Sequence, residues 1–278
     1  MMGNEKVKVC VKHQNIVKKF VEQYLDGEIR KITTFDFQSL NYKNSSNFDA
    51  DRTPIIRAIY CLLWRDKLEP EADCLFSTEI KYSGETLCTY KSAIISKYGK
   101  PFSKLDSISK NIVQKILIKY GIGFGNKIFN AATGSIVNNH QLGNFMPLSV
   151  ITKDTMNAPI QPLNPVRAQN GFFDYFDLFL EDIKKFYAGK QGSTLAPKLN
   201  KQFDANHLYF KNFNSFNDYI RYNLLDDFFE SSDENCNYEH MHNLSEIDFE
   251  SYVRQAMKII KKRGERILAE LELKLRQT

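Results

Sequence analysis

The feature that most constrains the fold is a long periodic segment, residues 249–275. Its apolar residues recur at helical spacing and include Phe249, Tyr252, Val253, Ala256, Ile260, Ile267, Leu268, Leu271 and Leu275. This pattern predicts one amphipathic helix over about residues 248–276. An isolated helix of this composition is marginal in water, so its apolar stripe from Phe249 to Ile260 has to pack against the rest of the chain.

The second half of this helix leaves two arrangements open. Its apolar stripe continues beyond Gly264 farther than a compact domain of this size readily covers. Gly264 also weakens the helix by about 1 kcal/mol relative to Ala. The end of the helix therefore either projects past the body and pairs with a second copy as a homodimer, or folds back over its own chain.

Basic residues cluster around Gly264. The candidate anion-binding residues are Lys261, Lys262, Arg263 and Arg266. Together with Lys258 and Arg254 they would form a cationic helical surface that suits nucleic acid, an acidic protein face or a nucleotide phosphate. The same residues also serve as ordinary solvated positions on long helices, and the sequence favours neither interpretation.

Composition indicates a globular chain. The 278 residues are 42% hydrophobic and 26% charged, which excludes a disordered protein. The net charge of +5 permits a nucleic-acid partner without requiring one. No run approaches the roughly 20 apolar residues of a membrane span, no signal-peptide pattern is present, and the five cysteines are scattered. These observations predict a cytoplasmic protein with no membrane partner.

Further helices are predicted from apolar spacing and capping residues over residues 11–25, 54–64, 107–117, 172–187 and 215–224. Alternating or β-branched runs predict strands within residues 30–40, 77–95 and 142–151. The expected fold is therefore α-rich α+β, with about six helices around a small antiparallel sheet. No break in composition divides the chain, so residues 1–278 are expected to form one domain.

The polar loop within residues 138–187 is the predicted site. His140 is the candidate catalytic base, and the candidate ligand-binding residues are Asn144, Asn164, Arg167, Asp174 and Asp177. Each has a structural alternative. His140 suits a backbone-bonded position at the start of a strand, and Arg167 suits an ion pair with Asp174. The carboxylates of Asp174 and Asp177 suit a solvated helix face better than a cation site.

No metal or cofactor is predicted. Cys236, His240 and His242 lack the second half of a tetrahedral zinc site. The LGNF turn, together with the Asn-rich loop that follows it, resembles part of an HNH-type nuclease domain. However, residues 125–139 contain no His, Asp, Glu or Cys that could ligate the metal of such a nuclease.

Several segments together resemble an uncharacterised bacterial family known only as a domain of unknown function. They are FDF (35–37), LLW (62–64), TYKSAIISKYGK (89–100), HQLGNFMPLS (140–149), NPVRAQNGFFDYFDLFLEDIKKFY (164–187), FNDYIRYNLLDDF (216–228) and KKRGERI (261–267). This resemblance implies one domain with a shared pocket and implies no reaction.

Two functions remain open, and the sequence does not decide whether the protein is an enzyme. The first is an effector or interaction protein that binds nucleic acid or a nucleotide, in phage defence or a toxin-like system. The alternative is a hydrolase or transferase acting on a phosphate-containing substrate, with His140 as base and Asn144 and Arg167 holding the anion. The absence of a nucleophile–base motif favours binding.

Overall fold

The computed structural model is helix-rich. It describes residues 2–41, 48, 50, 53–68, 82–86, 90–122, 129–130, 135–136, 140–149, 151–152, 159–160, 176–189, 213–228 and 248–277. The α-helices of these residues are α1 (Met2–Tyr24), α2 (Pro54–Leu68), α3 (Tyr90–Tyr98), α4 (Ser107–Lys119), α6 (Phe176–Tyr187), α9 (Phe216–Tyr222) and α10 (Phe249–Arg276). Short 3-10 helices connect them: η1 (Ile29–Thr33), η2 (Phe37–Leu40), η5 (Phe102–Lys104), η7 (Leu142–Asn144) and η8 (Asp226–Phe228).

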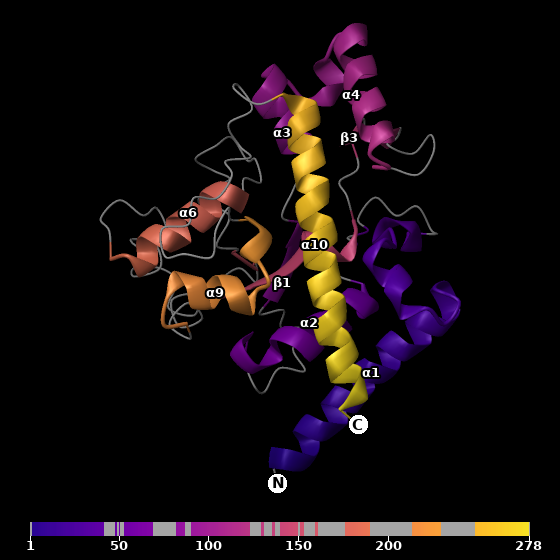
Figure 1. Cartoon of the computed structure of the whole chain (residues 1–278), viewed down its shortest axis with the longest axis vertical. Coiled ribbons are helices and arrows are strands. Elements are labelled where there is room, and N and C mark those ends of the chain that lie inside the picture. Colours follow the sequence, from indigo (N-terminus) through magenta and orange to yellow (C-terminus); the bar gives the residue numbers. More distant parts are fainter. Residues whose placement is uncertain are drawn as a thin grey trace.

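Helix α10 runs along most of the length of the molecule, and the other elements gather beneath and beside it (Figure 1). The carboxylate of Asp248 accepts a hydrogen bond from the backbone N–H of Ser251 and caps the helix at the predicted position. One face is buried from Phe249 to Leu271: Phe249, Tyr252, Val253, Ala256, Ile259, Ile260, Arg263, Gly264, Ile267 and Leu271. This face lies against α2, α3, α4, η1 and η7. The predicted packing of the Phe249–Ile260 stripe is confirmed.

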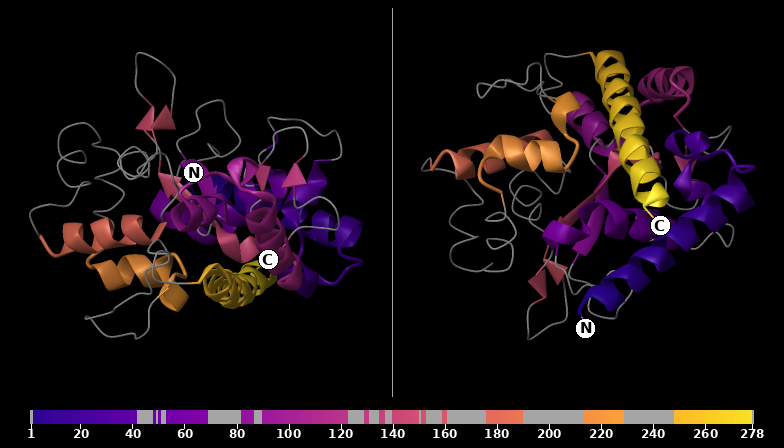
Figure 2. Two further views of the ribbon diagram at one scale, coloured as in Figure 1. Left: turned by 90° about the horizontal axis from the view of Figure 1, so that it is seen from above. Right: turned by 60° about the horizontal axis from the view of Figure 1, so that its bottom comes forward.

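The second half of α10 packs on its own chain rather than projecting from it. Ile267 and Leu271 are fully buried, well beyond Gly264. The side-chain amide of Gln14 in α1 donates a hydrogen bond of 2.7 Å to the backbone oxygen of Lys274. Both views in Figure 2 place this end of α10 beside the rest of the chain. The structure therefore has the folded-back arrangement, and this apolar stripe is not left exposed for a second copy.

The described strands form two-stranded antiparallel ladders only. The longest joins β1 (Tyr82–Thr86) to β4 (Phe145–Ser149), with Gly84 opposite Pro147. The two shorter ladders pair β2 (Phe129–Asn130) with β3 (Ser135–Ile136), and β5 (Ile151–Thr152) with β6 (Pro159–Ile160). Strands β1 and β4 fall within the predicted ranges 77–95 and 142–151, but residues 90–95 of the first range are helical, and a sheet enclosed by helices is not found among the described residues.

Two predicted strand regions are helical instead. Residues 30–40 form η1 and η2, because the Asp36 carboxylate accepts the backbone N–H of Gln38 and caps η2. Residues 90–98 form α3, where Tyr90, Ala93 and Ile94 are buried at i, i+3 and i+4. That spacing belongs to a helix face, and it outweighs the β-propensity of the isoleucines.

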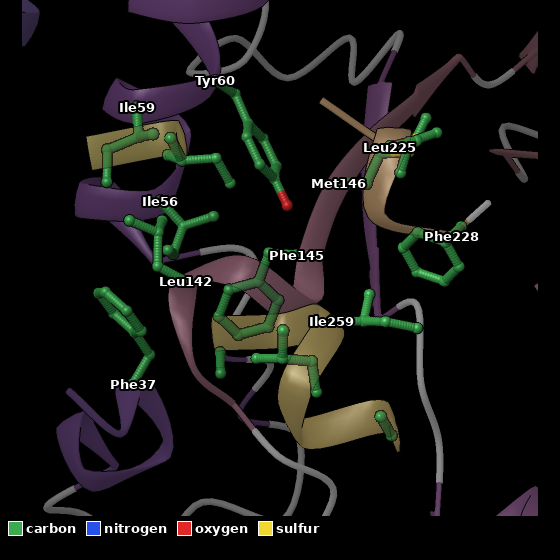
Figure 3. Close-up of a cluster of buried hydrophobic side chains, with 14 of the residues drawn as sticks. Phe37, Ile56, Ile59, Tyr60, Leu142, Phe145, Met146, Leu225, Phe228 and Ile259 are labelled. Carbon is green, nitrogen blue, oxygen red and sulfur yellow. The ribbon is translucent and has the colours of Figure 1, made fainter. Parts of the chain in front are cut away.

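The core beneath α10 draws on segments that are far apart in the sequence (Figure 3). Its labelled members are Phe37, Ile56, Ile59, Tyr60, Leu142, Phe145, Met146, Leu225, Phe228 and Ile259, all buried. The rings of Phe37 and Phe145 meet edge to face at 5.8 Å between centroids. This core fixes η7 and β4 under the middle of α10, where the polar residues described next converge.

Candidate functional site

The middle of α10 crosses η7 at very close range. Gly143 lies directly against the backbone of the helix: a Cβ added to it would come within 1.8 Å of the Ile260 carbonyl oxygen. The opposing helix position is Gly264, whose own Cβ would meet Gly143 only at 3.5 Å. A hydrogen atom in place of a side chain at Gly143 is therefore what permits this crossing.

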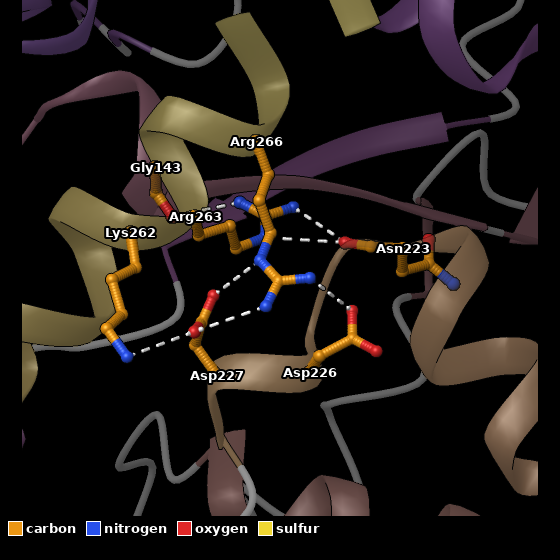
Figure 4. Close-up of polar contacts among 7 residues, drawn as sticks. All are labelled: Gly143, Asn223, Asp226, Asp227, Lys262, Arg263 and Arg266. Atoms are coloured by element: carbon orange, nitrogen blue, oxygen red, sulfur yellow. Dashed lines mark hydrogen bonds and ion pairs between the residues drawn. The ribbon is translucent and has the colours of Figure 1, made fainter. Parts of the chain in front are cut away.

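Arg263 extends from α10 into the interior beside this crossing (Figure 4). Its side chain is fully buried. The guanidinium donates to the backbone oxygens of Gly143 at 2.9 Å, Phe145 at 2.6 Å and Asn223 at 3.2–3.3 Å. It also lies over the ring of Trp64, 5.9 Å from the centroid. Arg263 thus joins α10 to η7, β4 and the segment after α9.

The predicted anion-binding role of Arg263 needs correction. A guanidinium with no exposed surface that is committed to three backbone carbonyls cannot reach an anion in solvent. The helical spacing in the sequence indicates that Arg263 occupies a buried position. Arg263 follows Ile260, the last of the buried residues Ala256, Ile259 and Ile260, by three residues, and it precedes the buried Ile267 by four. The residue type alone points the other way, because arginine is mostly exposed in folded proteins.

Arg266 and Lys262 pair with acidic residues of the same chain (Figure 4). Arg266 Nε lies 2.9 Å from Asp227 Oδ2, and its Nη1 lies 3.3 Å from Asp226 Oδ2. Lys262 Nζ lies 3.7 Å from Asp227 Oδ1. Since the Asp227 side chain is only 7% exposed, these cations also neutralise a carboxylate that is largely removed from water. Part of the predicted anion-binding set is therefore engaged within the molecule.

Arg254, Lys258 and Lys261 form what we call the outward row of α10. All three are exposed, and they stand at i, i+4 and i+7 along one helix face. Arg254 donates to the Ser251 hydroxyl at 3.3 Å. Among the described residues, Lys258 and Lys261 form no ion pair, in contrast to Lys262 and Arg266. Lys262 and Arg266 are exposed too, so what sets Lys258 and Lys261 apart is the lack of an ion pair within the described part of the chain.

Of the predicted polar loop, the structure describes His140 and Asn144 with their side chains. His140 is half-buried; its backbone oxygen accepts the N–H of Phe37 at 3.1 Å, and its ring centroid lies 6.1 Å from that of Phe145. Asn144 is fully buried in η7. The backbone bond of His140 matches its structural alternative, and the role of a catalytic base stays a prediction.

The remaining loop residues cannot be placed around His140. Asn164, Arg167 and Asp174 lie outside the described residues, as do Cys236, His240 and His242. Asp177 falls in the first turn of α6, but its side chain is not among those described. A common cavity for His140, Asn144 and Arg167 therefore stays a prediction. Within the described part of the chain, no group of three or more His, Cys, Asp or Glu side chains is arranged to hold a metal ion.

Asp36, next to the residue that bonds His140, has a perturbed acidity that yields a testable prediction. Burial raises the pKa of the Asp36 carboxyl, and the Gln38 N–H acts in the opposite direction. Because the folded pKa exceeds the unfolded one, the unfolded chain releases this proton first as pH rises, and ionisation of Asp36 costs stability above about pH 4. The Asp36→Asn variant keeps an oxygen for Gln38 and removes this cost.

We therefore expect Asp36→Asn to be slightly more stable than the unchanged chain at about pH 7, and equally stable near about pH 3. Urea unfolding followed by circular dichroism at the two pH values measures this difference. A gain of equal size at both pH values, or none at neutral pH, would show that Asp36 carries no burial cost.

Residues 130–267 match a family of unknown function, DUF6994. The resemblance to an uncharacterised domain family is confirmed over this stretch. Comparison with curated proteins gives no match, and comparison with solved structures gives none.

The DUF6994 match contains both partners of the close crossing. Gly143, Asn223, Arg263 and the Asp226–Asp227 pair all fall within it, as do η7, β4, α6 and α9. The FDF, LLW and TYKSAIISKYGK segments precede it. Arg263 and its backbone partners Gly143, Phe145 and Asn223 therefore all lie within the matched region. Trp64, which contacts Arg263, belongs to α2 outside it.

Proposed function

We propose that this protein binds nucleic acid through the outward row of α10, Arg254, Lys258 and Lys261. The observation that carries the proposal is the contrast along one helix. Arg263, Lys262 and Arg266 are engaged inside the molecule or with Asp226 and Asp227, whereas Lys258 and Lys261 are exposed with no ion pair among the described residues. Their charges are available to an external polyanion.

The spacing of the row favours an extended polyanion over a single phosphate. At a rise of about 1.5 Å per residue, Lys258 lies about 6 Å and Lys261 about 10 Å along the axis from Arg254. A row of this length can follow successive phosphates of a nucleic-acid backbone, whereas a nucleotide needs donors that converge on one point. Contacts of this kind supply affinity without sequence preference.

The row is also held on a rigid support. The opposite face of α10 is buried along most of its length, so Lys258 and Lys261 project from a helix that does not need to order upon binding. A role in phage defence or a toxin-like system, within a bacterial cytoplasm, belongs to the same proposal and depends on this binding step.

Fluorescence anisotropy with a labelled single-stranded DNA oligonucleotide tests the proposal. The Lys258→Gln/Lys261→Gln variant should bind more weakly. Its plot of log affinity against log salt should have a slope smaller by about 1.4, because two phosphate contacts are lost. The matched control is Lys18→Gln/Lys19→Gln, which removes two exposed charges from α1 and should keep the original slope. Equal binding by all three proteins would refute the proposal.

A further inference from the structure

Helix α4 exposes more apolar surface than a helix on a water-facing surface normally does. Its thirteen residues include six large aliphatic side chains, of which only Val113 and Leu117 are fully buried. Ile108 is 75% exposed, Ile112 46% and Ile118 61%. Figure 1 places α4 at one end of the molecule. Exposed apolar side chains gathered on one element indicate a surface that contacts something other than water.

The exposed side chains share one face together with a lysine. With about 100° of rotation per residue, Lys115 and the exposed Asn111 fall between Ile108 and Ile118, and Ile112 lies beside Ile108. We call Ile108, Ile112, Lys115 and Ile118 the α4 outer face. Helix α4 contains no acidic residue, and Lys115 forms no ion pair among the described residues. The outer face is therefore apolar and cationic at once.

We propose that the α4 outer face binds the surface of an anionic phospholipid membrane. At such an interface, isoleucine side chains enter the boundary between headgroups and acyl chains, while the lysine stem lies along the apolar surface and its ammonium reaches the phosphates. The contact is peripheral: none of the described helices is long and apolar enough to cross a bilayer. The predicted absence of a membrane-spanning segment agrees with the described helices, and a peripheral contact goes beyond that prediction.

The position of Lys115 favours a lipid surface over a protein as the partner of the α4 outer face. The cores of protein interfaces are depleted of lysine, because a buried ammonium needs a partner, and Lys115 stands in the middle of the apolar face. A second copy packed through the same face would bring the two Lys115 side chains together with no acidic residue on either α4. A lipid surface supplies negative charge at the required depth.

The helix is already formed and anchored, so binding does not have to order it. Asp106 caps its start by accepting the backbone N–H of Ser109 at 2.8 Å. At its other end Lys119 and Tyr120 both bond the Glu250 carboxylate of α10, and Lys119 in particular holds the pKa of Glu250 below its usual value. The face opposite the α4 outer face is held by Val113 and Leu117.

Co-sedimentation of the full chain with vesicles tests the proposal. Vesicles of phosphatidylcholine containing phosphatidylserine should bind the protein, and vesicles of phosphatidylcholine alone should bind it much more weakly. The Ile108→Ser/Ile112→Ser variant should lower partitioning onto the anionic vesicles at least about tenfold. The matched control, Val11→Ser/Leu273→Ser, removes exposed apolar side chains from α1 and α10 and should bind as before.

Three results would overturn the proposal. One is equal partitioning of the unchanged chain onto the two kinds of vesicle. Another is loss of binding in Lys258→Gln/Lys261→Gln with no loss in the isoleucine variant, which would assign the contact to the outward row of α10. The third is self-association in light scattering that the serine substitutions abolish, which would make a second copy the occupant. Circular dichroism of each variant verifies that it is folded.

Discussion

The Arg263→Met variant should lose about 3–5 kcal/mol of unfolding free energy, measured by urea denaturation. Methionine fills much of the same volume but donates no hydrogen bond. The carbonyl oxygens of Gly143, Phe145 and Asn223 would then lose a buried donor, and the contact with Trp64 would lose its charge. Arg254→Met, at an exposed position of the same helix, should change the stability by no more than about 0.5 kcal/mol.

Arg263→Lys separates geometry from charge at this position. Lysine keeps the positive charge, but its single ammonium cannot reproduce the fork that joins Asn223 on one side to Gly143 and Phe145 on the other. We therefore expect Arg263→Lys to fall much closer to Arg263→Met than to the unchanged chain. If Arg263→Lys is as stable as the unchanged chain, the charge alone matters and the hydrogen-bonded junction does not.

The Gly143→Ala variant should be destabilised by about 3 kcal/mol or more, because its new Cβ would collide with helix backbone rather than with a flexible side chain. The Ile260 carbonyl oxygen, at 1.8 Å from that Cβ, belongs to the middle of α10 and cannot move without shifting the helix. Thermal and urea unfolding of the purified variant measure the loss.

The matched control for Gly143→Ala is Gly264→Ala, on the other side of the same crossing. Its Cβ would meet Gly143 only at ordinary contact distance, 3.5 Å, and alanine favours a helix interior over glycine by about 1 kcal/mol. Gly264→Ala should thus be neutral or more stable by up to about 1 kcal/mol. Equal losses in the two variants would mean that the crossing is not limited by Gly143.

The parts of the fold that depend on neighbouring residues could be predicted from the sequence. The N-caps Asp106, Ser215 and Asp248 each accept a backbone N–H within three residues, and the predicted helix starts are confirmed there. Helix α10 follows from a stripe that repeats through seven turns. Residues 30–40 could not be predicted in the same way, because their aromatic alternation suits a strand as well as 3-10 turns packed against Phe20 and Phe145.

The candidate site was harder to predict because its partners are distant or belong to the backbone. Arg263 bonds carbonyl oxygens of Gly143 and Phe145, about which a side-chain pattern carries no information. Arg266 pairs with Asp226 and Asp227, 40 and 39 positions earlier in the chain. From sequence, helical spacing distinguishes only Arg263, which falls on the buried face of α10. Tertiary packing separates Lys262 and Arg266, which pair with Asp226 and Asp227, from Lys261, which forms no ion pair among the described residues.

That separation is the central claim, and oligonucleotide affinity measured for two variants of α10 tests it most directly. Two variants each lose two positive charges from the same helix: Lys258→Gln/Lys261→Gln and Lys262→Gln/Arg266→Gln. The affinity of each for the oligonucleotide would be measured by fluorescence anisotropy at a temperature below the midpoint of its thermal unfolding. We predict that the first variant loses most of the salt-dependent affinity, and that the second retains it because its charges are already paired with Asp226 and Asp227. Equal losses in both variants would contradict this division of the basic stretch.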